Sequence, residues 1–159
     1  GIGAAATILV SSAHSKGDHK QVRHTVGVAL ILAEAVALLV LIGLILGRNY
    51  LGYIFSDDPS IIAMTALAIL PMALYQPADA LQVIYSNALR GMEDVKHMAL
   101  YACGVHLIVA PALCLLIGFG LGLEGGGIQL TAVWSAFPVS LLLLGFLIKR
   151  RFDRISTLR

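Results

Sequence analysis

Long apolar stretches are the feature that most restricts the fold of this chain. Four runs, at residues 22–47, 59–89, 98–120 and 128–148, contain few charged side chains. A helix needs roughly 20 apolar residues to cross a hydrocarbon core of about 30 Å, so each run is long enough to span a bilayer. Apolar residues make up 58% of the chain and charged residues 13%, against about 45–50% and about 25% in soluble domains. The sequence therefore predicts an all-α integral membrane protein.

Basic residues are unevenly distributed around these four predicted spans. On an alternating path through the membrane, ten of the eleven Lys and Arg residues fall on one side. They are Lys16, Lys20, Arg23, Arg90, Lys96, Lys149, Arg150, Arg151, Arg154 and Arg159. Cytoplasmic segments of membrane proteins carry an excess of Lys and Arg. We therefore expect a multi-pass protein of the inner (plasma) membrane, with segment 12–23 and a basic C-terminal tail at 149–159 in the cytoplasm.

The stretch that precedes the first span, "GIGAAATILVSSA", is apolar but short. About twelve apolar residues are too few to cross a bilayer as a helix. The stretch is typical of the end of a helix whose beginning lies upstream, and it lacks an initiator methionine. We therefore expect the chain to be a fragment or a processed piece of a longer protein.

One polar stripe interrupts the second apolar run, within "LYQPADALQVIYSNALRG" at residues 74–91. Its members are Tyr75, Asp79, Gln82 and Ser86. At about 100° per residue, this i, i+4, i+7, i+11 spacing places all four on one side of a helix. Such a stripe is expected to face protein or a water-filled cavity, because lipid cannot solvate it. Asp79, near mid-membrane, is the strongest candidate for a functional residue.

Two prolines lie in the same run. Pro71 and Pro77 lack the backbone N–H that a helix needs, so helix breaks are expected at both residues, with a freed carbonyl at Ala73. Oxygen atoms of Asp79, Tyr75 and that carbonyl could form part of a Na⁺ site, and Asp79 could equally carry a proton. The structural alternative is that Asp79 bonds a neighbouring helix and Pro77 only shapes a kink.

Glu34 is a second acid inside a predicted span, at a depth similar to that of Asp79. Its helix has no polar stripe, so Glu34 either makes a structural hydrogen bond between helices or lines a cavity that handles ions or substrates.

The sequence contains no nucleophile–base pair, no paired catalytic carboxylates and no zinc-ligand spacing. We therefore expect no enzymatic activity, no cofactor apart from a coupling ion, no metal site beyond Na⁺ at Asp79, and no nucleic-acid partner.

The segment "SDDPSIIAMTALAILPMALYQPADALQVIYSNALRGMEDVK" resembles the tenth membrane helix and following loop of multidrug and toxic compound extrusion (MATE) transporters, particularly the NorM-like branch. The matching residues are Tyr75, Gln76, Asp79, Gln82, Leu89, Arg90, Gly91 and Asp94. The segments "AAATILVSSAHSKGDHKQVRHTVGVAL" and "LEGGGIQLTAVWSA" are similar to the connections between the eighth and ninth and between the eleventh and twelfth helices. The resemblance covers all 159 residues, which correspond to about the last third of a twelve-helix protein.

This resemblance implies a fold of two six-helix lobes around a central cleft, of which the chain supplies the end of one helix and four transmembrane helices. It implies antiport, in which Na⁺ or H⁺ enters while an organic, often cationic compound is exported by alternating access. Tyr75 and Asp79 match an aromatic residue and an acid that the family uses in cation coupling. The implied partners are the lipid bilayer, small organic substrates and an upstream N-terminal lobe of the same protein.

Two other functions fit the same helices. One is a related flippase for a lipid-linked oligosaccharide, although its phosphate-bearing substrates favour a basic cavity and no Lys or Arg lies deep in these spans. The other is a non-transporting membrane scaffold, in which the stripe from Tyr75 to Ser86 is only a packing seam.

Overall fold

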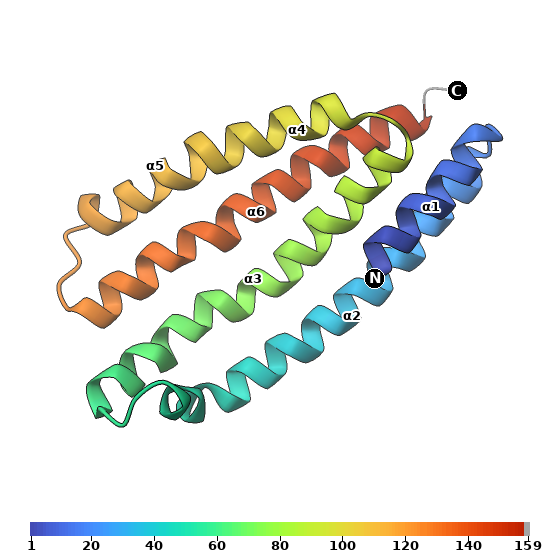
Figure 1. Ribbon diagram of the computed structural model, residues 1–159. Coiled ribbons are helices and arrows are strands. Elements are labelled where there is room, and N and C mark those ends of the chain that lie inside the picture. Colours follow the sequence, from blue (N-terminus) through green and yellow to red (C-terminus); the bar gives the residue numbers. More distant parts are fainter. Residues whose placement is uncertain (158–159) are drawn as a thin grey trace.

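The computed structural model describes residues 1–157, which form long helices without any strand (Figure 1). The helices are α1 (Ile2–Ser15), α2 (His19–Leu51), α3 (Pro59–Gly91), α4 (Val95–Gly104), α5 (Ala110–Leu115) and α6 (Gly126–Thr157). A 3₁₀ turn, η1 (Gly52–Ile54), follows α2, and two π-helical segments, η2 (Val105–Val109) and η3 (Leu116–Gly120), follow α4 and α5. The predicted all-α fold class is confirmed.

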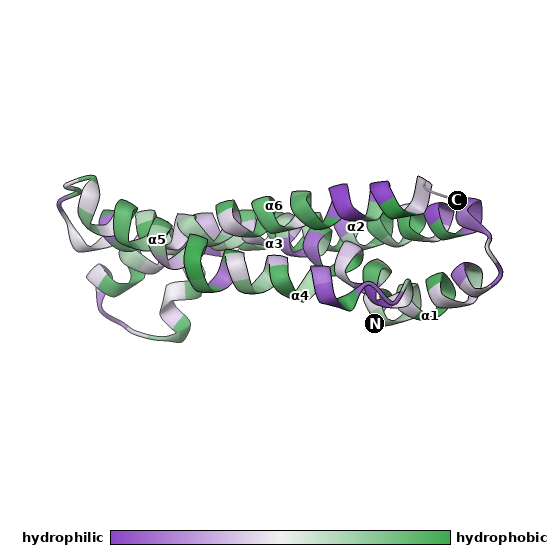
Figure 2. Ribbon diagram, turned by 90° about the horizontal axis from the view of Figure 1, so that it is seen from above, coloured by the Kyte–Doolittle hydropathy of each residue, from purple (hydrophilic) through white to green (hydrophobic). Residues whose placement is uncertain are grey.

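The central element is α3, which packs against α2 on one side and α6 on the other. These three helices form one layer, and α1 and α4 lie on the same side of it (Figures 1 and 2). The α1–α2 turn, the α3–α4 turn and the last turns of α6 meet at one end of the molecule (Figure 1). We call this end the basic end, because the predicted cytoplasmic Lys and Arg residues gather there.

Within residues 1–157, four helical segments are long and apolar enough to cross a membrane: His19–Ile54, Pro59–Gly91, Val95–Gly120 and Gly126–Thr157. Large apolar side chains along them are exposed, among them Ile31, Leu39 and Leu46 of α2. Hydrophobic residues cover the middle of the helices, whereas hydrophilic ones gather towards the end that holds the C-terminus (Figure 2). An apolar exterior of this kind suits a lipid environment, in which such side chains need no protein cover.

The helices are longer than the predicted membrane spans at 22–47, 59–89, 98–120 and 128–148. Where the membrane begins and ends along each helix stays a prediction. In particular, the segment 149–157, predicted as a tail, continues α6 as helix to Thr157, and residues 158–159 lie outside the described part. Two interactions help to hold this continuation. Lys149 Nζ lies 2.6 Å from the Asp153 carboxylate one turn later, and Arg23 of α2 donates from Nε to Ser156 Oγ at 3.2 Å. Lys149–Arg154 is therefore displayed on a regular helix.

The two turns at the basic end share a backbone hydrogen-bond pattern. The N–H of Asp18 donates to the carbonyl of Ala13 at 3.0 Å, and the N–H of Asp94 donates to that of Leu89 at 2.9 Å. In both, the preceding residue has a positive φ, 71° at Gly17 and 63° at Glu93. This is the Schellman arrangement, which satisfies carbonyls at a helix C-terminus.

The core lies towards the basic end, where α1 covers α2 and α3. Its apolar members are Ala6, Val10 and Ala13 of α1, Val22, Val26 and Ala29 of α2, Ala78, Ile84, Tyr85, Ala88 and Leu89 of α3, Met92, Val105, and Leu141, Leu144, Ile148 and Phe152 of α6. Gly91 permits a close approach of α3 to α1, because a Cβ there would lie 2.7 Å from the backbone oxygen of Thr7. The hydroxyl of Thr7 in turn donates to the Asn87 carbonyl at 3.1 Å. Small residues thus let α1 and α3 pack backbone to backbone.

The predicted helix breaks at Pro71 and Pro77 are wrong, because α3 remains one continuous helix from Pro59 to Gly91. Each proline removes one hydrogen bond, but the flanking turns keep theirs, and Pro71 is buried against neighbouring helices. Pro138 likewise lies inside a continuous α6. The third membrane-length segment behaves differently, because a π-helical stretch immediately precedes the α5 turn that contains Pro111.

Candidate functional site

The predicted polar stripe lies in the C-terminal half of α3, on the part that packs against α6. Tyr75, Asp79 and Gln82 are half-buried, and Ser86 is buried. Gln82 donates from Nε2 to Ser86 Oγ at 3.0 Å, so the last two members of the stripe are joined directly. The spacing read from the sequence thus produces one real contact within the stripe.

Tyr75 and Asp79 are arranged differently from the other pair. Within residues 1–157, neither side chain takes part in a hydrogen bond to another protein group, so the phenol oxygen and both carboxylate oxygens are available to a ligand. One helical turn separates the two residues, which places them on the same face of α3 about 5–6 Å apart at Cβ. A carboxylate and a phenol oxygen are hard ligands suited to Na⁺, and the carboxylate is also a proton acceptor.

A small hollow of about 340 Å³ adjoins Tyr75 between α3 and α6. Its lining includes Tyr75, Gln76, Trp134 and Phe137. The Trp134 and Phe137 rings lie 5.4 Å apart between centroids, at an interplanar angle of 46°. The stripe therefore borders an aromatic surface contributed by α6.

Glu34 comes from α2 and is half-buried. No hydrogen bond of its carboxylate occurs within the described chain, and none connects it with Asp79. The structure thus places the two acids on neighbouring helices without bringing them into one bonded site.

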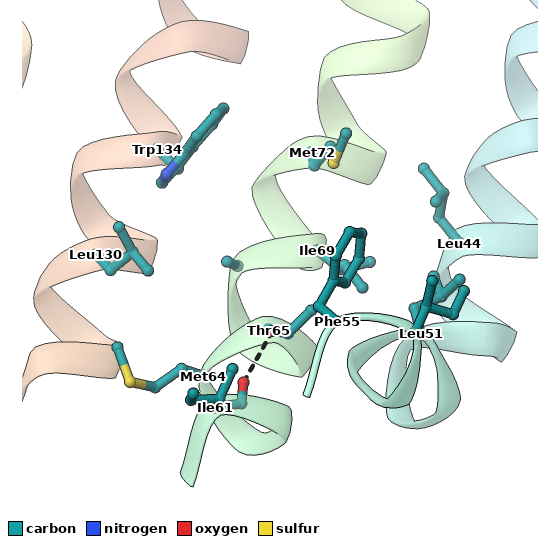
Figure 3. A pocket seen from close by; sticks show the side chains of 12 residues that line it. Leu44, Leu51, Phe55, Ile61, Met64, Thr65, Ile69, Met72, Leu130 and Trp134 are labelled. Carbon is teal, nitrogen blue, oxygen red and sulfur yellow. Dashed lines mark hydrogen bonds between the residues drawn. The ribbon is translucent and has the colours of Figure 1, made fainter. Parts of the chain in front are cut away.

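The larger pocket was not predicted from the sequence. It has a volume of about 500 Å³ and is lined by Leu44, Leu51, Ile54, Phe55, Ile61, Met64, Thr65, Ala68, Ile69, Met72, Leu130 and Trp134 (Figure 3). Its walls come from α2, η1, α3 and α6, so no local pattern in the sequence marks it. Thr65 is the main polar group, and its hydroxyl donates to the Ile61 carbonyl at 2.8 Å (Figure 3). Met72 and Trp134 also line the smaller hollow, so an apolar surface leads from η1 to Tyr75.

A polar cluster at the basic end was also missed. The Asp94 carboxylate accepts a hydrogen bond from Arg151 Nε of α6 at 2.6 Å, and its other oxygen lies 2.6 Å from His97 Nδ1. Burial disfavours the charged carboxylate, but the hydrogen bonds from Arg151 and His97 outweigh that effect and lower the pKa of Asp94. The cluster ties the α3–α4 turn to the end of α6.

Residues 1–157 contain no group of three or more His, Cys, Asp and Glu side chains placed to hold a metal ion. The free cysteines Cys103 and Cys114 lie on the third membrane-length segment. Any cation at Asp79 would therefore depend on hydroxyl and carbonyl oxygens to complete its ligands.

Comparison with known proteins places these features in context. The MatE family model matches residues 1–122. The probable multidrug resistance protein NorM of Bradyrhizobium diazoefficiens is 31% identical over 160 residues, covering 98% of this chain and 33% of the relative. The NorM of Neisseria meningitidis serogroup B is 29% identical over 146 residues, with 88% and 29% covered. The protein DETOXIFICATION 17 of Arabidopsis thaliana is 35% identical over 144 residues, with 91% and 30% covered.

A solved structure has the same fold. The crystal structure of the eukaryotic MATE transporter AtDTX14 superposes with a TM-score of 0.71 at 23% identity, covering 97% of this chain and 36% of that one. The chain thus spans about a third of the length of the curated relatives and the solved structure that it matches.

Proposed function

The chain belongs to the MatE family, and from this premise we propose that it is the C-terminal part of an antiporter that exports organic, often cationic compounds in exchange for Na⁺ or H⁺. The relatives named multidrug resistance protein NorM support export as the activity. The four membrane-length helices support a multi-pass protein whose immediate partner is the lipid bilayer. In this proposal, an N-terminal lobe completes the transport pathway, and segment 12–23 and the C-terminus face the cytoplasm of the inner (plasma) membrane.

The observation that carries the proposal is the position of Asp79. Its half-buried carboxylate lies well inside a membrane-length helix, about 18 Å from the C-terminal end of α3, without a hydrogen-bond partner in the described chain. An acid at that depth is costly unless it binds something, and intramembrane acids mark ion and substrate pathways. Asp79 binds the coupling ion in this proposal, and Tyr75 supplies a second oxygen from the preceding turn.

Coupling requires that the ion and the exported compound prefer different conformations. A ligand shifts a conformational equilibrium only through its differential affinity for the two states. An ion on Asp79 removes the need to keep that carboxylate hydrated, and so favours the state in which α3 and α6 close around Tyr75 and Asp79. In this proposal, Gln82 and Ser86 of α3 and Glu34 of α2 line the transport pathway that the N-terminal lobe completes.

The test is ion-driven efflux of a fluorescent cation by the intact transporter in membrane vesicles. We expect Asp79→Asn to abolish efflux under both a Na⁺ and a proton gradient, while expression and membrane insertion stay close to wild type. Tyr75→Phe is expected to weaken coupling to whichever ion is used. The matched control is Asp57→Asn, which removes an exposed acid of the η1–α3 connection and should leave efflux intact.

Efflux that survives in Asp79→Asn would refute the coupling role of this residue. Loss of the folded protein in Asp79→Asn would instead assign Asp79 a structural role. Glu34→Gln distinguishes the two possible roles of the second acid. A changed pH profile of efflux would assign Glu34 to ion handling, and an unchanged profile would leave it structural.

A further inference from the structure

The later part of α6 presents a mixed face, partly apolar and partly basic. The five residues Val139, Leu143, Phe146, Arg150 and Arg154 are all exposed. At about 100° per residue, they fall within roughly 80° of one another on the helix surface. We call this set the α6 outer ridge. It changes from three apolar side chains to two arginines in the direction of the basic end.

The opposite face of α6 is the packed one. Leu141, Ile148 and Phe152 are buried against the other helices, and at about 100° per residue they point roughly 160–200° away from Arg150. The outer ridge therefore faces away from the rest of this chain between residues 139 and 154.

The four basic residues of Lys149–Arg154 divide into two classes. Lys149 pairs with Asp153, and Arg151 pairs with Asp94, each at 2.6 Å. Arg150 and Arg154 make no ion pair with any carboxylate in residues 1–157. Their positive charges are thus directed outward, whereas the other two are neutralised within the protein.

Arg150 is held in line with the apolar part of the ridge. Its guanidinium carbon lies 5.6 Å from the centroid of the Phe146 ring, a cation–π contact that supports the side chain against the helix surface. Arg154 lies one turn further on, about 6 Å along the axis. Two guanidinium groups are therefore presented in sequence just beyond a strip of exposed hydrocarbon.

From this ridge we propose that α6 binds an anionic phospholipid, with the acyl chain along Val139, Leu143 and Phe146 and the headgroup phosphate between Arg150 and Arg154. Guanidinium groups match phosphate oxygens in geometry and charge. The adjoining apolar strip matches the attached acyl chain, which a free phosphate lacks. This assignment does not depend on the proposed transport activity.

The experiment reconstitutes the 159-residue chain in nanodiscs with equal amounts of phosphatidylglycerol and phosphatidylcholine, extracts it in mild detergent, and counts retained lipids by native mass spectrometry. Wild type is expected to retain phosphatidylglycerol preferentially. The double variant Arg150→Gln/Arg154→Gln is expected to lose about tenfold or more of that preference, since each juxtamembrane cation contributes about fivefold.

The matched control is Lys16→Gln/Lys20→Gln, which removes the same charge from exposed positions at the same end of the molecule. We expect it to change the preference less than twofold. Arg150→Lys/Arg154→Lys keeps the charge and should retain most of the bound lipid, with helix content by circular dichroism confirming that each variant is folded.

Three results would overturn the proposal. Equal losses in the arginine and lysine variants would indicate attraction by net charge alone. Full displacement of phosphatidylglycerol by an equal concentration of inorganic phosphate would indicate a simple anion site. A wild-type dimer without excess phosphatidylglycerol, abolished by Arg150→Gln/Arg154→Gln, would show that a second copy of the chain covers the ridge.

Discussion

The two turns at the basic end have the same backbone design but use their aspartates differently. Asp18 caps the N-terminus of α2, the helix that follows it, because its carboxylate accepts a hydrogen bond from the Gln21 N–H at 2.8 Å. Asp94 occupies the equivalent position before α4 but makes no such cap. Its carboxylate instead binds Arg151 and His97.

The comparison shows how a local motif becomes a tertiary contact. The same hydrogen-bond pattern ends α1 and α3, and in both turns it places an aspartate just after the residue with positive φ. Whether that side chain serves the next helix depends on which cation is within reach. At Asp94 the end of α6 supplies one, and the Arg151 guanidinium brings a positive charge on the donor that a backbone N–H lacks.

Removing the tertiary contact should have the largest effect. Asp94→Ala deletes two hydrogen bonds to charged or polar partners and leaves Arg151, which is only 22% exposed, without its carboxylate. We expect a loss of about 1.5–3 kcal/mol of unfolding free energy. The measurement is unfolding in mixed detergent micelles with increasing dodecyl sulfate. Asp153→Ala, which breaks a more exposed ion pair, should cost less than about 1 kcal/mol, and an equal cost would contradict the special role of Asp94.

The same contact predicts a pH dependence. Because the pKa of Asp94 is lowered in the folded protein, its contribution to stability is complete above the ordinary carboxyl pKa of about 3.9 and is lost as the pH falls through the lower folded value. Wild type and Asp94→Ala should therefore differ by a constant amount near neutral pH and converge below about pH 4. A difference that shrinks between pH 8 and 6 instead would assign the effect to a group other than this carboxyl.

A backbone change in the α1–α2 turn should have the next largest effect on the unfolding free energy. Gly17 has a φ of 71°, and a Cβ there would meet no atom within 4 Å, so Gly17→Ala tests conformation without a clash. We expect a loss of about 1–2 kcal/mol. Gly104→Ala is the control, because Gly104 lies in helix and also has open space, and that variant should be neutral or slightly stabilising.

The local cap should have a smaller effect than the tertiary contact. Asp18→Ala removes the hydrogen bond to the Gln21 N–H, for which a cost of about 1 kcal/mol is typical. The comparison between the two turns would fail if this variant destabilised the protein more than Asp94→Ala does in the same micelle titration.

A substitution in the α3–α4 turn should increase the stability of the protein. Glu93 has a φ of 63° and is exposed, so Glu93→Gly relieves a backbone conformation that favours glycine and loses no packing. The gain should be about 0.5 kcal/mol, because glycine also costs more entropy on folding. A decrease in stability would mean that the Glu93 side chain makes a contribution beyond its backbone.

The membrane-length helices could be predicted from the sequence because each is a long apolar run, and the family was indicated by the resemblance of residues 56–96 to a MATE membrane helix and the loop that follows it. The comparisons confirm that resemblance. The Gln82–Ser86 contact also follows from helical spacing, since both residues lie on one helix. Local periodicity is sufficient wherever both partners belong to the same element.

The remaining features depend on contacts between distant parts of the chain. Asp94 and Arg151 are 57 positions apart, and no pattern in either segment indicates the other. The pocket of about 500 Å³ draws its walls from three helices and η1, so its residues look like ordinary lipid-facing positions in the sequence. Pro77 was expected to break its helix on local grounds, and the intact turns and packing on either side override that preference.

The approach of Gly91 to the Thr7 backbone has a mechanical consequence. Because a Cβ at position 91 would lie 2.7 Å from the Thr7 oxygen, a slide of α1 along α3 that brought a residue with a side chain to this contact would cause a clash. We therefore expect α1 to move together with α3 when α3 tilts. Because Gly91 lies at the basic end, a rotation of α3 about this contact would displace the opposite end most, around η1 and the start of α3.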